Sequence, residues 1–563
     1  MPIKNNKKRI RIYKFFRHNW RVMVMVFLPL ILSPMALSGS KSMQCGYIIT
    51  ILAIFWLTEP MHIAVSSLLP LVMFPVFKIL EPKEVTACYM KDITLMLLGG
   101  LIIAKTIEKQ NLHKRLALNI LSLMGPNPVF QYFGFMFSTW FTSMWISNAS
   151  TTAMMITLAS AVSEQYVLLH ENDSDHKDES STLVDSLTTT STYEISNSSE
   201  SEDVRKAKYI GKGLMLSIAY SATCGGMATI PGTPPNLVFY DIMETRYGSR
   251  LKLNFGSFMI FSLPMSMLII FICWVLLLWR YIGFNESFNR KADPLRDKKM
   301  MDSIKSEITE LGPLSYGEIS TLTVFIFLVF LWVLRDPGYP ILARLFMYKE
   351  KGKIVKYWTD GISAMLVTLL AFNLPAQNPL KCHVKDHNDK LIDWRHIEKG
   401  FPWGVLFLFG GGFAIAAGCE KSGLSKVIGD FLTYLSSLPH FLLLLLISLG
   451  ISFLTEFTSN VVTATILLPI LVKMAECIHM HPIRMGLIVT LSCSFSFCLP
   501  AATPANAIVI GTGKVQVVDM VTTGFLLNII CVLVVSVISY YWSCPIFTAD
   551  VFPNWIKVNC TTE

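Results

Sequence analysis

The chain has 563 residues, of which 52% are hydrophobic and only 15% are charged, and its mean hydropathy is +0.50. Soluble globular proteins carry about 25% charged residues, so this composition excludes the soluble classes. The apolar residues fall in roughly a dozen blocks that approach the ~20 residues needed to span a bilayer, which predicts an all-α polytopic membrane protein. The net charge of +9 does not indicate a nucleic-acid partner, because much of the excess lies in the first 21 residues.

Residues 1–21 form a basic segment without any acidic residue, and its cations are Lys4, Lys7, Lys8, Arg9, Arg11, Lys14, Arg17 and Arg21. Basic residues before a first span are typical of a cytoplasmic flank, and they can contact anionic membrane lipids. No convincing small-residue cleavage site follows them. We therefore expect a retained first span, which begins a first structural repeat over residues 22–164.

Polar segments divide the rest of the chain. Between Glu171 and Asp203, ten acidic residues stand against one lysine, so residues 165–206 are expected to form a disordered cytoplasmic loop. Residues 207–284 complete the first repeat, residues 285–316 form another cytoplasmic loop, and residues 317–543 form the second repeat. The tail, residues 544–563, contains an acceptor sequence for N-glycosylation at Asn559, which predicts an extracellular tail and an odd number of spans.

The two halves of the chain repeat each other. Residues Gly99–Leu116 match Gly411–Ile428 at eight of eighteen positions, at an offset of 312, and the Ser147-Asn148 pair meets Ser459-Asn460 at the same offset. A second match, between residues 232–236 and residues 502–506, has an offset of 270, because the acidic loop is inserted in the first half only. Duplicated halves are typical of secondary transporters, whose site lies where the repeats meet. An odd number of spans between equivalent positions of the two halves predicts that the halves cross the membrane in opposite directions.

Each matched glycine pair begins a short apolar block that soon becomes polar. We expect a re-entrant hairpin at about residues 92–115 and another at about residues 402–425. Such a hairpin is tolerated only where protein or water surrounds its backbone. The alternative is an ordinary short span whose small residues pack against other helices.

The SN motifs place side-chain oxygens in apolar surroundings, where polar groups are costly unless they are paired. The prolines of the TPPN and TPAN motifs break a helix and expose carbonyl groups nearby. We therefore predict two sodium sites flanking one anion, the first formed by Ser147, Asn148, Gly232 and Asn236, the second by Thr458, Asn460, Ala502 and Asn506. The alternative is that these polar residues only bond neighbouring helices. With no basic cluster in the motifs, the anion would depend on bound sodium.

Several further motifs lie along the chain: FWLTEP at 55–60, MWISN at 144–148, TEFTSN at 455–460, TPANAIV at 503–509 and FPNW at 552–555. Together they resemble the divalent anion–sodium symporters, a family that includes sodium-coupled dicarboxylate, citrate and sulfate transporters. The resemblance implies eleven transmembrane helices, two re-entrant hairpins, and a homodimer of scaffold and transport domains that move in an elevator mechanism. It also implies that substrate contacts Ser147, Asn148, Ala149, Thr233, Pro234, Ser459, Asn460, Val461, Thr503 and Pro504.

Ala149 and Val461 replace the family's usual threonines, and valine at the second position resembles citrate-preferring members. We expect sodium-coupled uptake of di- or tricarboxylates such as succinate or citrate at the plasma membrane, with sodium–sulfate symport as the alternative. A channel would not need the repeated hairpins. An enzyme is not expected, since no HExxH or GxSxG motif occurs at a membrane face, and no cofactor is expected beyond the sodium ions that are carried.

Overall fold

The computed structural model describes residues 19–181, 202–283, 294–334, 347–350, 353–379, 390–424, 427 and 438–556. Predictions made for the basic segment before residue 19, for residues 182–201 and for Asn559 lie outside these ranges. The first half contains α2 (Ser33–Leu37), α3 (Lys41–Thr58), α4 (Ile63–Ser66), α5 (Leu69–Val76), α6 (Pro82–Tyr89), α7 (Asp92–Lys109), α8 (Leu112–Met124), α9 (Pro128–Ser143), α10 (Asn148–Ser181), α11 (Glu202–Gly226), α12 (Pro234–Tyr247), the 3-10 helix η1 (Gly248–Leu251), α13 (Phe255–Leu277) and the π-helix η2 (Leu278–Ile282).

The second half follows the same course after a connecting region. Its elements are α15 (Pro294–Glu310), α16 (Tyr316–Leu334), β1 (Met347–Glu350), β2 (Lys353–Lys356), α18 (Asp360–Asn373), α19 (Trp394–Gly400), α20 (Trp403–Lys421), α22 (His440–Thr455), α23 (Asn460–Cys477), α24 (Pro482–Ser492), α25 (Pro504–Gly511), α26 (Val517–Tyr541) and α27 (Ser543–Phe547).

The prediction of a helical multi-pass membrane protein is confirmed. Within the described residues, eight helices are long and apolar enough to cross a membrane, and four shorter apolar helices accompany them. The departure from an all-α chain is an antiparallel β-hairpin, in which Met347 pairs with Lys356 and Glu350 with Lys353.

The bounds of the helices repeat with the offsets seen in the sequence. Helices α9 and α22 are equivalent over their whole lengths at an offset of 312, and α10 and α23 begin at the equivalent asparagines. Helices α12 and α25 begin at equivalent prolines, at an offset of 270. The duplication is therefore structural, and each half contains a helical hairpin followed by a broken helix.

The hairpins differ in position from those expected at 92–115 and 402–425. Helices α7 and α20 run without a break over 18 and 19 residues and belong to candidate spans, and α8 begins only at Leu112, after α7 has ended. Their glycines serve close packing: a Cβ on Gly99 would lie 2.7 Å from Ala364 Cβ of α18, and one on Gly411 would lie 2.8 Å from the Ser67 carbonyl oxygen. The hairpins that carry the SN motifs are instead α9–α10 and α22–α23, with the motif at the tip of each.

Two segments expected to be loops contain helix. Helix α10 continues to Ser181, into the acidic segment 165–206, because extending a formed helix costs far less than starting one. In the segment 285–316, α15 lies beside α8 and is linked to it by a Lys114–Glu307 ion pair of 2.8 Å. Cys477 is bonded in a disulfide, while nine other described cysteines are free thiols.

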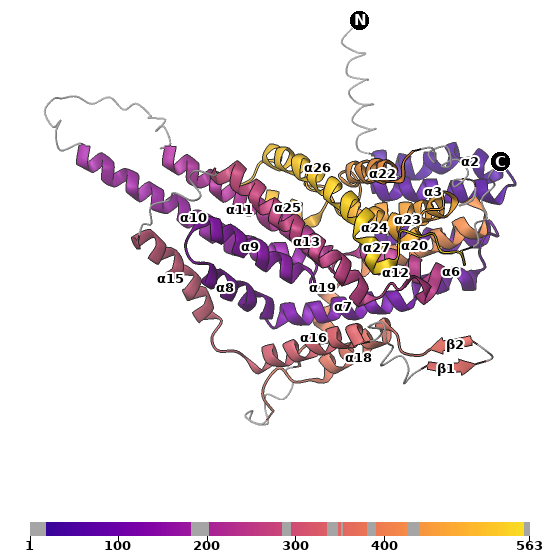
Figure 1. The fold of residues 1–563 in the computed structure, drawn as a ribbon, viewed down its shortest axis with the longest axis horizontal. Coiled ribbons are helices and arrows are strands. Elements are labelled where there is room, and N and C mark those ends of the chain that lie inside the picture. Colours follow the sequence, from indigo (N-terminus) through magenta and orange to yellow (C-terminus); the bar gives the residue numbers. More distant parts are fainter. Residues whose placement is uncertain are drawn as a thin grey trace, which may run out of the picture.

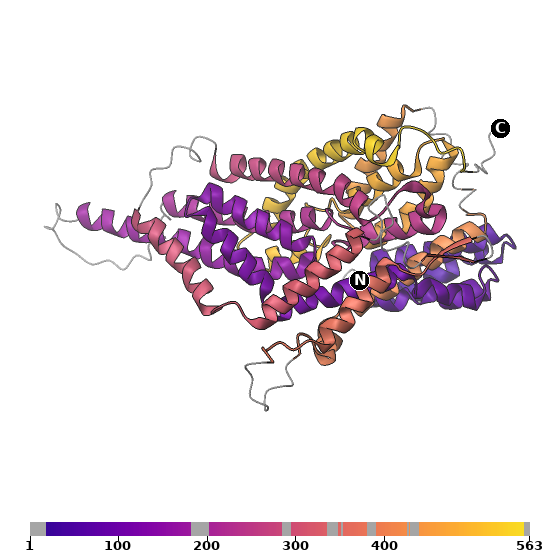
Figure 2. The same ribbon diagram turned by 60° about the horizontal axis from the view of Figure 1, so that its bottom comes forward.

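The two halves exchange contacts where their hairpins and broken helices meet. Helix α10 packs against α25 of the other half, and α12 packs against α23. Such reciprocal packing is what a two-fold relation between the halves produces. Helices α16 and α18 lie along one side of the molecule, next to α7 (Figure 1), and Figure 2 brings this side forward. The broken helices are among the most buried elements; Ser217, Tyr220 and Asn236 have no exposed surface.

Candidate functional site

In the first half, the hairpin tip and the helix break lie against each other. The Asn148 side chain begins α10, and its Oδ1 accepts a hydrogen bond of 2.7 Å from the Ser143 hydroxyl at the end of α9. Gly226 ends α11, where a Cβ would lie 2.8 Å from Asn148 Oδ1. Glycine therefore allows the backbone of the break to approach the tip.

Asn236 fixes the shape of this break from inside. Its Nδ2 donates to the carbonyl oxygens of Gly226, at 3.1 Å, and Thr229, at 2.7 Å. Its Oδ1 is buried and has no hydrogen-bond partner. A buried acceptor without a donor is uncommon and costly, and a bound cation would satisfy it.

The second half contains the same arrangement. Asn460 begins α23, and its Oδ1 accepts from the hydroxyls of Thr455, at 2.9 Å, and Ser496, at 3.2 Å. Asn506 Nδ2 donates to the carbonyl oxygens of Ser496, at 2.8 Å, and Leu499, at 3.0 Å. Its Oδ1 is also buried without a partner.

The contacts of these asparagines repeat between the halves, except the bond from the Ser496 hydroxyl to Asn460. The tip asparagine accepts from the residue five positions before it, and the buried asparagine donates to the carbonyls seven and ten positions before it. Ser496 occupies the position of Gly226. Its hydroxyl lies at the place where, in the first half, the glycine allows the backbone to approach the tip asparagine closely. We call these two clusters half-site 1 (Ser143, Asn148, Gly226, Thr229, Asn236) and half-site 2 (Thr455, Asn460, Ser496, Leu499, Asn506).

Proline determines where each broken helix resumes. Pro234 and Pro504 lie at the first helical position, where a missing N–H costs nothing and the fixed φ suits a helix. Thr503 caps α25, because its hydroxyl accepts from the Asn506 N–H at 3.3 Å. Thr233 makes no equivalent bond in α12. Four helices, α10, α12, α23 and α25, thus begin at the two half-sites.

The structure brings together only some of the residues predicted as ligands. Ser147 bonds Ser150, hydroxyl to hydroxyl at 3.0 Å, and Thr458 bonds the Leu454 carbonyl and Thr463 rather than half-site 2. The remaining predicted residues lie at the same tips and breaks: Ala149, Gly232, Thr233, Ser459, Val461 and Ala502. Residues 147–150 and 458–461 are half-buried, so both tips are partly accessible, whereas Asn236 and Asn506 are fully buried.

Sequence reasoning missed Glu456, which is 5% exposed and forms no ion pair within the described residues. Its carboxylate accepts from the N–H groups of Cys498, at 2.9 and 3.1 Å, and Leu499, at 2.9 Å, and from Asn528 Nδ2 at 2.6 Å. In the first half the equivalent position is Met144, whose carbonyl accepts from the Thr229 hydroxyl at 2.5 Å. An ionisable residue inside an apolar block was the signal that could have identified Glu456.

No lysine or arginine hydrogen-bonds to a side chain of either half-site in the described part of the chain. The groups that converge there are carbonyl, amide and hydroxyl oxygens, with the Glu456 carboxylate behind half-site 2. Such groups can bind a sodium ion without first displacing a lysine or arginine side chain. Buried breaks of this kind, repeated in two related halves of a multi-pass chain, define the secondary transporters.

Comparison with known proteins gives the family. Residues 14–548 match the model of the sodium:sulfate symporter transmembrane region. Solute carrier family 13 member 1 of Rattus norvegicus is 37% identical over 578 residues, covering 95% of this chain and 96% of that protein. The Na(+)/citrate cotransporter of Rattus norvegicus is 36% identical over 561 residues, with 95% and 96% covered, and human solute carrier family 13 member 2 is 34% identical, with 96% and 95% covered.

The chain therefore belongs to the sodium:sulfate symporter family, and it is a sodium-coupled anion cotransporter rather than an enzyme. The resemblance drawn from its motifs is confirmed. A solved structure, that of the Alcanivorax borkumensis YdaH transporter, covers 80% of this chain and 84% of its own at 13% identity, with a TM-score of 0.42. A similarity at that level does not bear on the site.

Proposed function

We propose that the protein carries di- or tricarboxylates into the cell across the plasma membrane, together with sodium ions bound at half-sites 1 and 2. The observation that supports this most is the repeated buried asparagine. Asn236 and Asn506 each hold two backbone carbonyls and leave one oxygen without a donor. Unwound backbone carbonyls with side-chain oxygens are what transporters use to coordinate sodium.

The anion would bind between the two tips. The N-termini of α10, α12, α23 and α25 lie at the half-sites, and each helix N-terminus carries a partial positive charge and free N–H groups. These groups suit a carboxylate or another oxyanion. Ala149 and Val461 follow the tip asparagines, so their small apolar side chains would border the anion.

Sodium coupling follows from the charges at the site. Glu456 lies behind half-site 2, and no basic side chain bonds either half-site in the described residues. An anion brought there alone would meet a negative group and only partial positive charges. Bound sodium supplies the missing charge, so anion binding without sodium is unfavourable.

The remaining elements of the proposal concern the whole molecule. The reciprocal packing of α10 with α25 and of α12 with α23 is consistent with inverted halves. An elevator movement of a transport domain against a scaffold, in a homodimer, is what the family resemblance implies. We propose eleven spans, with an extracellular tail glycosylated at Asn559.

Sodium–sulfate symport is the second candidate, because the matching family model is that of sodium:sulfate symporters. The two candidates share both half-sites and differ only in the anion. The relatives include Na(+)/citrate and Na(+)/dicarboxylate cotransporters as well.

Uptake of radiolabelled succinate, citrate and sulfate, in sodium and in choline medium, tests both candidates. We expect sodium-dependent carboxylate uptake that Asn148→Ala or Asn460→Ala abolishes without loss from the cell surface. Asn373→Ala is the matched control, since Asn373 is exposed and bonds only its own helix. Uptake of sulfate alone would replace the carboxylate assignment, and full uptake by both tip variants would refute the site.

A further inference from the structure

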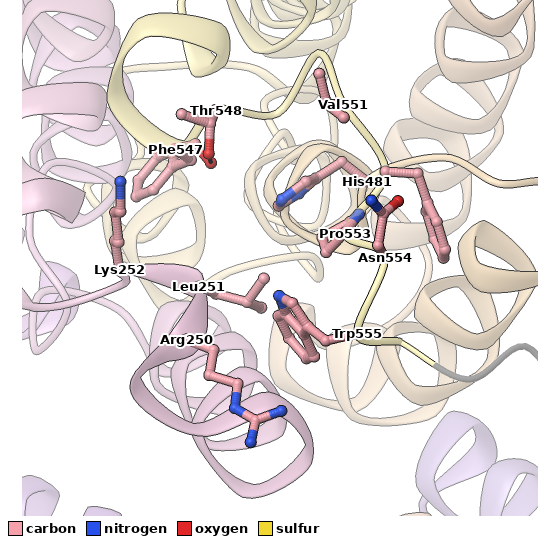
Figure 3. Close-up of a pocket in the computed structure, with 11 residues that line it drawn as sticks. Arg250, Leu251, Lys252, His481, Phe547, Thr548, Val551, Pro553, Asn554 and Trp555 are labelled. Atoms are coloured by element: carbon pink, nitrogen blue, oxygen red, sulfur yellow. Dashed lines mark hydrogen bonds between the residues drawn. The ribbon is translucent and has the colours of Figure 1, made fainter.

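A cavity of about 240 Å³ lies away from both half-sites, where the C-terminal segment folds back over the protein. Its walls are Arg250, Leu251 and Lys252, which follow α12, His481 at the start of α24, and residues between Phe547 and Trp555. Figure 3 shows Lys252, His481, Thr548 and Trp555 around one open space. This cavity, which we call the tail pocket, has no role in the transport chemistry derived above.

The charges that line the tail pocket are all positive. Arg250 and Lys252 are exposed, and neither is in an ion pair within the described part of the chain. Arg250 is held over the Trp555 ring, with 5.3 Å from its Cζ to the ring centroid. Lys252 has a φ of +55°, a left-handed conformation that is costly for a lysine. Its carbonyl accepts from the Ser257 hydroxyl at 3.0 Å, which helps to hold the backbone there.

A further cation lies behind the pocket. Arg484 of α24 is 6% exposed and lies over the Tyr540 ring, and its Nη2 donates to Cys544 Sγ at 3.1 Å. Its Nε has no hydrogen-bond partner, and the described residues offer it no ion pair. Burial and Arg484 lower the pKa of His481 to about 4, and Asp550 opposes this shift. His481 is therefore neutral at pH 7, and the charged side chains that line the pocket are those of Arg250 and Lys252.

We propose that the tail pocket is a second anion site, which binds an oxyanion group beside Lys252. Arg250 points past Trp555 in this structure (Figure 3), and because it is exposed and has no ion pair among the described residues, it can turn towards a bound anion. Neutral donors can complete the site, because the His481 ring and the Trp555 indole also line it. Its volume suits a sulfate, a small carboxylate or the head group of one lipid. The lining of the pocket begins at Phe547, soon after the candidate span α26 ends at Tyr541, so a lipid head group is a candidate ligand as well as a dissolved anion.

The pocket is joined to both half-sites by two helices. Helix α12 runs from half-site 1 to the pocket, and α24 runs from the pocket to half-site 2; they have 14 and 11 residues, or about 21 and 16 Å at the usual rise. The two helices also pack against each other. An anion in the tail pocket would thus bridge the C-terminal end of α12 and the N-terminal end of α24, and would favour one arrangement of the half-sites.

Equilibrium binding of ³⁵S-sulfate to the purified full-length protein tests the site, in buffer where choline replaces sodium so that the coupled site stays empty. The double variant Arg250→Gln/Lys252→Gln is compared with wild type and with Lys83→Gln/Lys399→Gln, which removes the same charge from exposed lysines that are outside the pocket. We expect saturable sulfate binding that the pocket variant weakens by about tenfold or more, because charge-assisted contacts are lost, and that the control variant keeps.

A second measurement distinguishes the source of the anion. Native mass spectrometry after incubation with phosphatidylserine or phosphatidylcholine vesicles shows whether a lipid is held. If sulfate does not bind but phosphatidylserine is retained by wild type and lost from the pocket variant, the ligand is a head group. If neither sulfate nor phosphatidylserine distinguishes the pocket variant from wild type, the tail pocket is not an anion site. Sodium-dependent uptake is measured separately, so failure here leaves the proposed transport function intact.

Discussion

Glu456→Gln changes one buried carboxylate oxygen to an NH2 group and is expected to weaken half-site 2. The carboxylate accepts four hydrogen bonds from three donors on the 498–499 backbone and on Asn528. Glutamine keeps one acceptor oxygen, but its NH2 group would face the N–H groups that now bond the carboxylate. At least one hydrogen bond to the helix break is therefore lost. Hydrogen bonds to charged groups contribute about 1.5–3 kcal/mol each. We expect the interaction between the tip of the second hairpin and its helix break to weaken by about 2–4 kcal/mol.

Sodium would then have to bring the two segments together itself. Because 1.4 kcal/mol corresponds to tenfold in an equilibrium constant, we expect half-saturation by sodium to shift upwards by about tenfold or more. Uptake is measured against sodium concentration, with surface biotinylation to correct for expression. The matched control is Glu164→Gln, an exposed carboxylate paired only with Lys514, whose loss costs about 0–1 kcal/mol. An unchanged sodium dependence in Glu456→Gln at normal surface levels would refute the reasoning.

Three further predictions concern other parts of the molecule. Gly226→Ala should reduce sodium-dependent uptake at least several-fold, because its Cβ would lie 2.8 Å from the tip asparagine of half-site 1, while Gly450→Ala, with nothing within 4 Å, should transport normally. Burial lowers the pKa of His481 from 6.5 to about 4, so the unfolded chain binds a proton more readily than the folded protein, and the fold loses stability as the pH falls below 6.5. At pH 5 this loss is about 2 kcal/mol. His481→Gln should therefore flatten the pH dependence of thermal unfolding between pH 7 and 5. Cys477 is expected to be disulfide-bonded in the purified protein, and non-reducing peptide mapping that finds a free Cys477 thiol would contradict this.

The sequence predicted the duplication and the two polar breaks, because both depend on residue types at fixed offsets. Asn148 and Asn460 stand at equivalent places in the chain, and the structure places them at equivalent places in the fold. The partners of these side chains were not predictable in the same way. Ser143 and Thr455 are ordinary helix residues in sequence, and only the fold of the hairpin turns them towards the asparagines.

The hairpins were misplaced because glycine pairs have two uses that look alike in sequence. Gly99 and Gly411 allow helices to approach closely, which is the alternative interpretation of the same pattern. The role of Glu456 depends on N–H groups that become free only once the helix breaks near residue 498. A charged side chain is rarely buried without partners. The partners of Glu456 are backbone N–H groups at the helix break, which its neighbours in sequence do not reveal.

We propose above all that both half-sites are needed to bind sodium and the anion together. Equilibrium binding of ²²Na⁺ to the purified protein, with and without the transported anion, tests it in wild type, Asn236→Ala and Asn506→Ala. We predict that each single variant loses sodium binding at its own half-site, and that in both variants the anion no longer enhances the sodium binding that remains. Wild-type sodium binding and wild-type enhancement by the anion in either variant would contradict the claim.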